Sequence, residues 1–489
     1  MRLTIQEICE ATGGTLYGGN DGFSAVIVKA VSTDSRADVT GCLFIPIKGP
    51  AFDGHDYIET AFSKGAICTL SEREVQNESF PQIKVSSTRQ ALIDLAVYDR
   101  NRFKGPVLAI TGSAGKTTTK EMLASVMSQK FKTLKTLGNF NNDIGLPLSL
   151  LSREEDHELM VLEMGMNHLG EISVLSRIGR PDICMITNIG DAHIENLGSR
   201  EGILRAKSEI FEGMREGGTV ILNGDDPLLA GLPIVPHAGK TIYCHLRHNK
   251  PPATIQDEGN WIAADYIDRQ GLQGTICTVM WNIEGIKNTF AGSMMDMSKG
   301  STSIEIPLPG DYMIMNALMA FAAGLETGLN IDQICEGIKN FTPAGNRMAI
   351  SEVNGMIIIN DTYNASPPSM KAAIDMLAGD LKNTGRRKVC ILGDMLELGD
   401  HAEVMHREVG QYAAGKGIDM LISIGPLSKF SCEAFKEAAP HSEARHFMSY
   451  EFFIAKWRSL LTEGDTVLVK ASRGMALEHV VKSLMSDRS

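Results

Sequence analysis

The sequence predicts an α/β protein of several domains, and three observations support this fold class. The chain has 489 residues, too many for a single hydrophobic core. Short apolar runs alternate with helical patterns, as in parallel sheets that helices cover on both faces. Turn residues at Lys104–Pro106 and near Pro343 divide the pattern. We expect an N-terminal α/β domain over residues 1–104, a central domain with a mostly parallel sheet over 105–341, and a C-terminal Rossmann-like α/β domain over 342–489.

Composition and charge exclude several classes of protein. The net charge of −12 argues against nucleic acid or an anionic membrane surface as the main partner. The nine cysteines include no Cys-x-x-Cys pair, which favours reduced thiols over a disulfide framework or a zinc site. The chain has no signal-peptide pattern at its start and no apolar run of membrane-spanning length. We therefore expect a cytoplasmic protein.

The elements of the first two domains follow from apolar runs and their spacing. In the first domain the runs are Ala25–Val28, Cys42–Ile45 and Ala66–Cys68, and a helical pattern over Gln90–Arg102 closes it. In the central domain continuous apolar strands are predicted at Val107–Ile110, Leu159–Glu163, Asp182–Asn188 and Thr219–Asn223. Residues 240–308 change to short alternating runs, such as Thr275–Trp281, which indicate an antiparallel excursion attached to the sheet.

The last third of the chain returns to the alternation of helices and strands. Helical patterns occupy Tyr312–Gly328 and Ile331–Asn340. The strands of the third domain are predicted at Gly355–Asn360, Lys388–Leu392, Met420–Ile424 and Thr466–Lys470.

The most informative motif is the turn after the first central strand. Gly112-Ser-Ala-Gly-Lys-Thr117 places two glycines and a Lys-Thr pair between a strand and a helical pattern. Backbone N–H groups in such a turn cradle phosphate oxygens, and the helix dipole favours their negative charge. Lys116 can reach the β- and γ-phosphates, and the Thr117 hydroxyl can bind Mg²⁺. Ile110 stands where the full Walker pattern has glycine. The prediction therefore rests on the half-motif Gly112–Thr117, which favours a nucleotide-binding loop over a fortuitous turn.

Polar residues after the next strands suggest a metal site. Glu163 ends a strand and would complete a Mg²⁺ shell beside Thr117, unless it only faces solvent. Asp191 and His193 follow the next strand, at the sheet edge where α/β proteins bind ligands. A lone histidine is otherwise a surface or core residue. Lys207 lies on an amphipathic helix, where its spacing favours a solvated lysine.

Three further features leave two interpretations open. The polar segment Asn139–Gly145 is equally typical of a ligand loop and of an ordinary turn. Asp361 and Asn364 follow a strand and can contact a ligand, although their position before a helix favours capping. Arg347 can supply a cation to a transferring phosphoryl group, or it is an exposed arginine between domains.

Six blocks in order resemble the Mur ligase family of the bacterial cell-wall pathway, over nearly the whole chain. The blocks are Ser32–Arg36 with Leu43–Gly49 and Phe52–Tyr57, then Thr111–Thr117, Asn141–Pro147, Glu163–Asn167, Thr187–His193 and Asp361–Pro367. The last block is similar to that of the members that join UDP-MurNAc-tripeptide to D-Ala-D-Ala. The Asp-Asn-Pro-Arg motif of the members that add a diamino acid is absent. The resemblance implies an ATP-dependent amide ligase, a monomer, with an N-terminal domain for the UDP-linked substrate.

The resemblance also implies roles for individual residues. ATP would contact Thr111, Gly112, Ser113, Ala114, Gly115, Lys116, Thr117, Asn316, Arg347 and Asp361. Two Mg²⁺ ions would be held by Thr117, Glu163, His193 and Lys207, of which Lys207 occupies the place of a lysine that is carbamylated in several members. The catalytic residues would be Lys116, Glu163, His193, Lys207 and Arg347. Asp34, Ser35, Arg36, Asn142 and Asn364 would contact the substrates.

Two departures and two rival functions accompany this resemblance. Tyr312 stands where these ligases often have histidine, and Asn346 stands where glycine is common. One rival is another amide ligase of the superfamily, such as the diamino-acid-adding Mur ligase or a folylpolyglutamate synthase. The other is a P-loop ATPase or GTPase that acts as a switch and needs no amino substrate.

Overall fold

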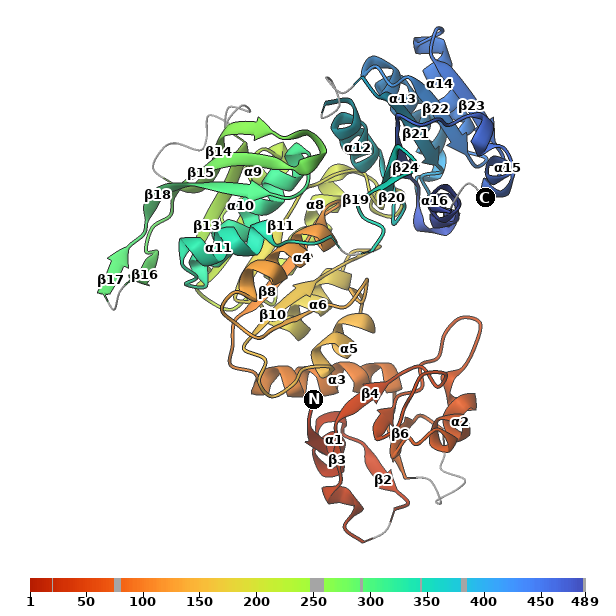
Figure 1. Ribbon diagram of the computed structural model, residues 1–489. Coiled ribbons are helices and arrows are strands. Elements are labelled where there is room, and N and C mark those ends of the chain that lie inside the picture. The colour runs from red at the N-terminus through yellow and green to blue at the C-terminus, as the bar shows by residue number, and fades with distance from the viewer. Residues whose placement is uncertain are drawn as a thin grey trace.

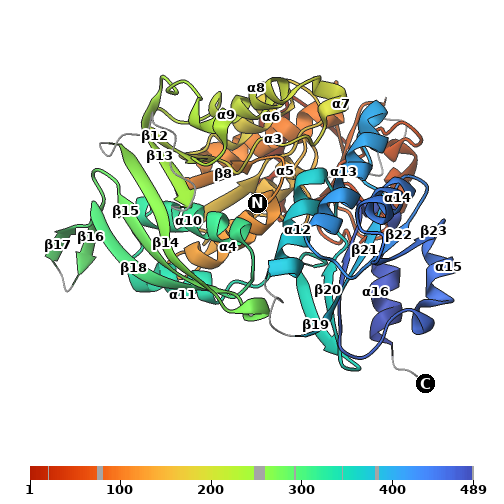
Figure 2. The ribbon, with the colours of Figure 1, turned by 90° about the horizontal axis from the view of Figure 1, so that it is seen from above.

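The computed structural model describes residues 1–19, 21–73, 81–246, 259–290, 293–343, 345–379 and 385–486. They form three α/β domains, each built on its own sheet (Figure 1). The N-terminal domain lies at one end of the molecule, and the C-terminal domain lies beside the central domain (Figures 1 and 2). The predicted fold class is confirmed. None of the described helices combines the length and the apolarity that crossing a membrane requires.

The N-terminal domain has a five-stranded sheet of order β2-β7-β6-β5-β4 and a separate β1-β3 ribbon. Its elements are β1 Leu3–Thr4, α1 Ile5–Thr12, β2 Thr15–Tyr17, β3 Ile27–Val28, β4 Ala30–Ser32, β5 Cys42–Phe44, α2 Ile58–Ser63, β6 Cys68–Ser71, β7 Gln82–Lys84 and α3 Thr88–Arg102. Helix α3 joins this domain to the central one. Its buried Arg100 donates hydrogen bonds to the carbonyls of Gly179 and Arg180, at 2.6 and 2.9 Å.

The central domain has a nine-stranded sheet of order β18-β15-β14-β13-β12-β11-β8-β10-β9. Its strands are β8 Val107–Thr111, β9 Thr133–Lys135, β10 Leu159–Glu163, β11 Ile183–Ile186, β12 Gly218–Asn223, β13 Ala238–Leu246, β14 Asn260–Arg269, β15 Thr275–Asn282 and β18 Lys299–Ile306, with a β16–β17 ribbon at Lys287–Phe290 and Ser293–Asp296. The strands from β8 to β14 pair in parallel, and β15 and β18 are antiparallel. The predicted excursion is therefore real, but its start near residue 240 is wrong because β13 and β14 continue the parallel sheet.

Helices from the segments between and after its strands cover this sheet. They are α4 Lys116–Met127, α5 Gly145–Leu151, α6 Glu171–Gly179, α7 Ile194–Leu197, α8 Arg200–Ser208, α9 Pro227–Ala230, α10 Asp311–Glu326 and α11 Ile331–Lys339. Helix α10 is buried along most of its length, because it packs between α4, α11 and the sheet. Two separate hydrophobic clusters lie on the two faces of the sheet, which explains why strands such as β8 and β10 are apolar at every position.

The C-terminal domain has a six-stranded sheet of order β19-β20-β24-β21-β22-β23, in which only β19 is antiparallel. Its elements are β19 Ala349–Val353, β20 Met356–Asp361, α12 Pro367–Gly379, β21 Arg387–Gly393, α13 Ala402–Gly415, β22 Met420–Ile424, α14 Lys429–Ala438, β23 Glu443–Phe447, α15 Tyr450–Ile454, β24 Asp465–Lys470 and α16 Glu478–Met485. Its core also consists of two clusters, one on each face of the sheet. The carboxyl ends of β8, β10 and β11 and those of β20, β21 and β24 lead into loops that line one cleft.

Candidate functional site

A cleft of about 670 Å³ lies between the central and C-terminal domains. Loops at the carboxyl ends of the parallel strands line it, as expected for ligand sites of open α/β sheets. The cleft brings together most of the residues that the sequence singled out: Ser113, Ala114, Gly115, Lys116, Thr117, Asn142, Glu163, His193, Asn316, Arg347, Asp361 and Asn364.

The phosphate-loop motif forms the turn between β8 and α4. Helix α4 begins at Lys116 without a side-chain cap, which leaves the first N–H groups of its amino end directed at the cleft. The Lys116 ammonium donates to the carbonyl of Gly112 at 2.7 Å. Burial lowers the pKa of Lys116, the Glu163 carboxylate opposes this shift and Arg347 adds to it. Gly112 has to be glycine, since a Cβ there would lie 1.9 Å from the Thr187 hydroxyl oxygen.

The Thr117 hydroxyl and the Glu163 carboxylate converge at the floor of the cleft. Thr117 Oγ donates to Glu163 Oε2 at 2.8 Å, and Asn141 Nδ2 donates to Glu163 Oε1 at 2.8 Å. Glu163 is buried at the end of β10 and does not face solvent. Hard oxygen donors of this kind suit Mg²⁺, so Thr117 and Glu163 fit the metal site that the sequence predicts.

Lys120 lies behind this floor, and sequence reasoning missed it. Its side chain is fully buried, and its ammonium donates to the carbonyl of Thr136 at 2.8 Å. The same nitrogen lies 3.0 Å from Glu121 Oε1 and 3.8 Å from Glu163 Oε2. Lys120 therefore places a positive charge behind the Glu163 carboxylate. Its position one helical turn after Lys116 is the only signal in the sequence.

His193 lines the cleft beside the phosphate loop. Its Nδ1 lies 3.3 Å from Glu397 Oε2, and its Nε2 has no hydrogen-bond partner among the described residues. Burial, followed by the charges of Lys116 and Lys207, lowers the pKa of His193 to about 4. The ring is therefore neutral at neutral pH, the form that binds metal ions.

Lys207 is buried on α8, so the interpretation as a solvated lysine is wrong. Burial and the charge of Lys116 lower the pKa of Lys207 well below its ordinary value. Lys207 has no ion-pair partner in the described part of the chain. A buried lysine without a partner favours its neutral amine.

The C-terminal wall of the cleft is built on β20 and β24. The ammonium of Lys470 pairs with the Asp361 carboxylate and donates to the carbonyl of Asn364 at 2.9 Å. Asp361 thus takes part in an ion pair. The interpretation that it caps the following helix is wrong, because α12 begins only at Pro367. Arg347 lies 3.7 Å above the centre of the Tyr363 ring, and Arg473 contacts the same ring at 5.1 Å. Sequence reasoning missed Tyr363, Lys470 and Arg473.

Three predicted ligand-binding residues differ in how the structure places them. Asn142 lines the cleft, but its Oδ1 accepts hydrogen bonds from the N–H groups of Ile144 and Gly145 at the start of α5. Asn316, on α10, lies next to the phosphate loop, since a Cβ on Gly115 would be 3.5 Å from Asn316 Oδ1. Thr111 is buried in β8 behind the loop.

Asp34, Ser35 and Arg36 lie in the N-terminal domain and are not among the described residues that line the cleft. They follow β4, and the Arg36 guanidinium donates two hydrogen bonds of 2.9 Å to the Asp34 carboxylate. The side-chain and backbone hydrogen bonds from Arg36 lower the pKa of Asp34 to about 2. Lys64 fixes this turn by donating to the carbonyls of Ser35 and Arg36.

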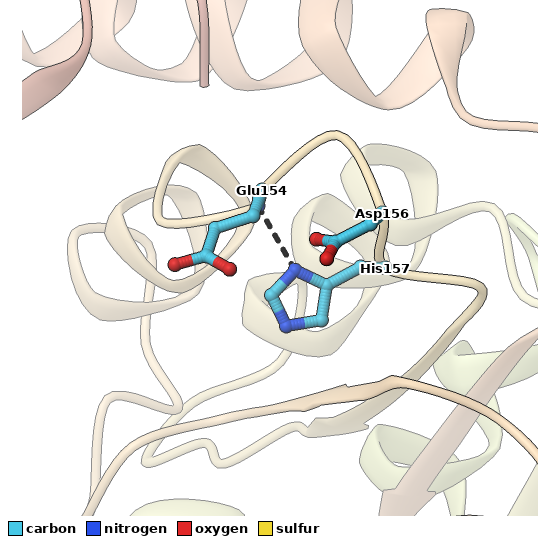
Figure 3. Close-up of side chains that lie close together, drawn as sticks. All are labelled: Glu154, Asp156 and His157. Atoms are coloured by element: carbon cyan, nitrogen blue, oxygen red, sulfur yellow. Dashed lines mark hydrogen bonds between the residues drawn. The ribbon is translucent and has the colours of Figure 1, made fainter.

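Outside the cleft, Glu154, Asp156 and His157 form a group that resembles a metal site (Figure 3). The Lys132 ammonium lies 2.7 Å from both carboxylates and offsets one of their two negative charges. His157 Nδ1 accepts a hydrogen bond of 2.9 Å from the N–H of Glu154. The Lys132 ammonium thus lies where a metal ion would bind to the two carboxylates, and this exposed group is explained without a metal ion.

Comparisons with known proteins match the whole chain. Three family descriptions match: "Mur ligase family, catalytic domain" over residues 27–100, "Mur ligase middle domain" over 110–324 and "Mur ligase, glutamate ligase domain" over 346–473. The chain is 38% identical to UDP-N-acetylmuramoyl-tripeptide–D-alanyl-D-alanine ligase of Bacillus subtilis, over 100% of this chain and 99% of that protein.

Solved structures are similar over the same length. The crystal structure of MurF from Acinetobacter baumannii is 30% identical, with a TM-score of 0.84 and coverage of 100% of this chain and 99% of that one. MurF ligase from Thermotoga maritima, solved in complex with ADP, is 26% identical with a TM-score of 0.75, over 94% and 97% of the two chains.

Proposed function

This chain belongs to the Mur ligase family, and we propose that it is an ATP-dependent ligase that joins D-Ala-D-Ala to UDP-MurNAc-tripeptide. The products are UDP-MurNAc-pentapeptide, ADP and phosphate, and the role is peptidoglycan synthesis in the cytoplasm. The observation that carries this proposal is the cleft, in which the phosphate loop of one domain faces Arg347, Asp361 and Asn364 of another.

The reaction has two stages, and its first stage uses positive charges from two domains. The terminal carboxylate of the tripeptide attacks the γ-phosphorus of ATP, which gives an acyl phosphate and ADP. The amine of D-Ala-D-Ala then displaces phosphate and forms the amide. The first stage brings a carboxylate to a triphosphate, and this repulsion has to be offset by fixed positive charge. Lys116 from the central domain and Arg347 from the C-terminal domain supply that charge at the two walls of the cleft.

Mg²⁺ is the metal that the donor set supports. Thr117 and Glu163 would hold one ion, with Lys120 behind the carboxylate, and His193 and Lys207 would hold a second. When bound, the ions neutralise phosphate charge and orient the phosphates. An unmodified Lys207 offers no oxygen ligand, but burial lowers the pKa of its amine and so favours the uncharged form, which is the form that reacts with carbon dioxide. The resulting carbamate would bring two oxygens to the site.

Each domain has a separate part in this proposal. Residues 1–104, with Asp34, Ser35 and Arg36, bind the uridine-diphosphate end of the substrate. Residues 105–341 bind ATP, with Asn316 near the nucleotide. Residues 342–489 supply Arg347 and Asp361 to ATP and receive the dipeptide. A closed cleft excludes water from the acyl phosphate, which would otherwise hydrolyse.

The test compares phosphate release with amide formation. The purified chain is given ATP, Mg²⁺ and UDP-MurNAc-tripeptide, with and without D-Ala-D-Ala, and products are followed by mass spectrometry. We expect pentapeptide only with all reactants present, at one phosphate for each new amide. A nucleotide-dependent switch would release phosphate regardless of both peptides, and a diamino-acid-adding ligase would require a different pair of substrates. Nucleotide hydrolysis without a new amide would contradict the proposal.

A further inference from the structure

Two cleft residues with left-handed backbones face each other across the domain boundary. His193 of the central domain has φ of 65°, and Glu397 of the C-terminal domain has φ of 63°. Seven described non-glycine residues have positive φ, and two of them make this one contact of 3.3 Å. Such conformations cost energy and persist where the surrounding structure imposes them, often at ligand sites.

The loop that carries Glu397 is held rigidly by buried groups. The carboxylate of Asp394 accepts hydrogen bonds from the N–H groups of Leu427 and Ser428. The next two residues are held through their own N–H groups, which donate to His406 Nε2 at 3.0 Å and to Ser472 Oγ at 2.9 Å. The C-terminal domain therefore presents Glu397 from a fixed loop.

Neighbouring contacts show that the two domains meet at this side of the cleft. A Cβ on Gly399 would lie 3.3 Å from Glu195, which follows His193 closely in the chain. A Cβ on Gly190 would lie 3.2 Å from Pro368 of the C-terminal domain. The segment that bears His193 is thus in contact with the C-terminal domain on both sides of the histidine.

We propose that Glu397 is a positioning residue that orients His193 toward the second metal ion. This inference rests on the proposed function, which gives His193 that ion. A carboxylate that accepts the Nδ1–H of a metal-binding histidine fixes its tautomer and ring orientation, and leaves Nε2 for the metal. Because the carboxylate and the imidazole belong to different domains, the histidine is fully oriented only when the domains are together. Glu397 thereby couples domain closure to metal binding.

Binding of Mn²⁺ tests this inference without relying on turnover. Mn²⁺ is titrated by electron paramagnetic resonance into the full chain with a non-hydrolysable ATP analogue. We expect Glu397→Ala to weaken the weaker of two Mn²⁺ sites at least about tenfold, as loss of such a partner does elsewhere. Glu397→Gln keeps a side-chain oxygen that can accept a hydrogen bond from His193 Nδ1, so this variant should remain close to the wild type. Glu403→Ala, an exposed glutamate of the same domain, is the matched control.

A double-mutant cycle separates positioning from a general structural effect. If Glu397 acts only through His193, Glu397→Ala should cause no further loss in a His193→Ala background. Equal losses in both backgrounds, or unchanged Mn²⁺ affinity in Glu397→Ala, would overturn the inference. Failure of the proposed function has another signature, because the wild type would then form no pentapeptide. Since the Glu397 side chain is 68% exposed, the variants should fold, and thermal unfolding checks this.

Discussion

At the scale of residues, the phosphoryl transfer that we propose depends most directly on the charge of Lys116. The ammonium is buried beside the carbonyl of Gly112, where a phosphate oxygen can replace that carbonyl as its partner. We expect Lys116→Met to lower ADP release at least about 100-fold, the loss seen when one preorganised donor to developing charge is removed. Coupled-enzyme detection of ADP measures this. Lys104→Met, an exposed lysine outside the cleft, is the control, and near-normal turnover of Lys116→Met would contradict the phosphate role.

Glu163 should determine the magnesium requirement of the reaction. Its carboxylate and the Thr117 hydroxyl are the oxygen pair at the floor of the cleft. We expect Glu163→Gln to raise the Mg²⁺ concentration for half-maximal activity about tenfold or more, because a neutral amide is a weaker ligand for a hard cation. Glu158→Gln, at the exposed residue just before the same strand, should leave the Mg²⁺ titration unchanged. An unaltered titration in Glu163→Gln would remove Glu163 from the metal site.

Functional residues that belong to a contiguous motif could be predicted from the sequence. Residues that only folding brings to the site were missed. The Gly112–Thr117 turn is a contiguous motif, so its position between β8 and α4 could be predicted. Lys207 could not be placed from its helical spacing, because only the packing of α8 shows that it is buried. Glu397 and Arg473 follow β21 and β24, which are distant in sequence but neighbours in the sheet. No local pattern marks such a pair.

At the scale of elements, regular parallel strands could be predicted well because both faces are buried and their apolar runs are continuous. Strands β10 and β22 begin and end where the sequence predicts. The edge strands β9, β19 and β23 were missed, since an edge strand of three to five residues is only partly buried and carries no apolar run. The alternating runs of residues 240–308 predict antiparallel strands, and β14 bears this out on one side only, because it pairs antiparallel with β15 and in parallel with β13.

A neutral histidine stabilises the loop after β21, so the stability of this loop should depend on pH. The buried His406 accepts the N–H of Met395 at Nε2, and its Nδ1 lies 2.7 Å from the carbonyl of Ala402. Burial lowers the pKa of His406 below its ordinary value of 6.5. The unfolded chain therefore binds the proton more readily, and stability from this imidazole is complete above pH 6.5 and is lost as the pH falls through the folded pKa.

We expect His406→Leu to destabilise the C-terminal domain by about 1–3 kcal/mol at pH 8, since it leaves the N–H of Met395 without its partner. At pH 5.5 the difference from wild type should be smaller, because only the wild type loses stability through protonation of this ring. Differential scanning calorimetry at both pH values measures the difference. His441→Leu, an exposed histidine of the same domain, is the control. A difference of the same size at both pH values would show that protonation of His406 does not affect stability.

At the scale of the whole molecule, the described residues that line the cleft come from the central and C-terminal domains, and none of them comes from the N-terminal domain. We expect an ATP analogue with Mg²⁺ to slow amide hydrogen exchange in the phosphate loop Gly112–Thr117 and also in two C-terminal segments, 361–366 and 470–475, because all three line the cleft. The turn at Asp34–Arg36 should respond only when the UDP-linked substrate is added. Hydrogen exchange followed by mass spectrometry measures both steps in the full chain. Protection confined to the central domain would mean that the C-terminal wall of the cleft does not contact the nucleotide. Protection of Asp34–Arg36 by the ATP analogue alone would contradict the assignment of ATP and the UDP-linked substrate to separate sites.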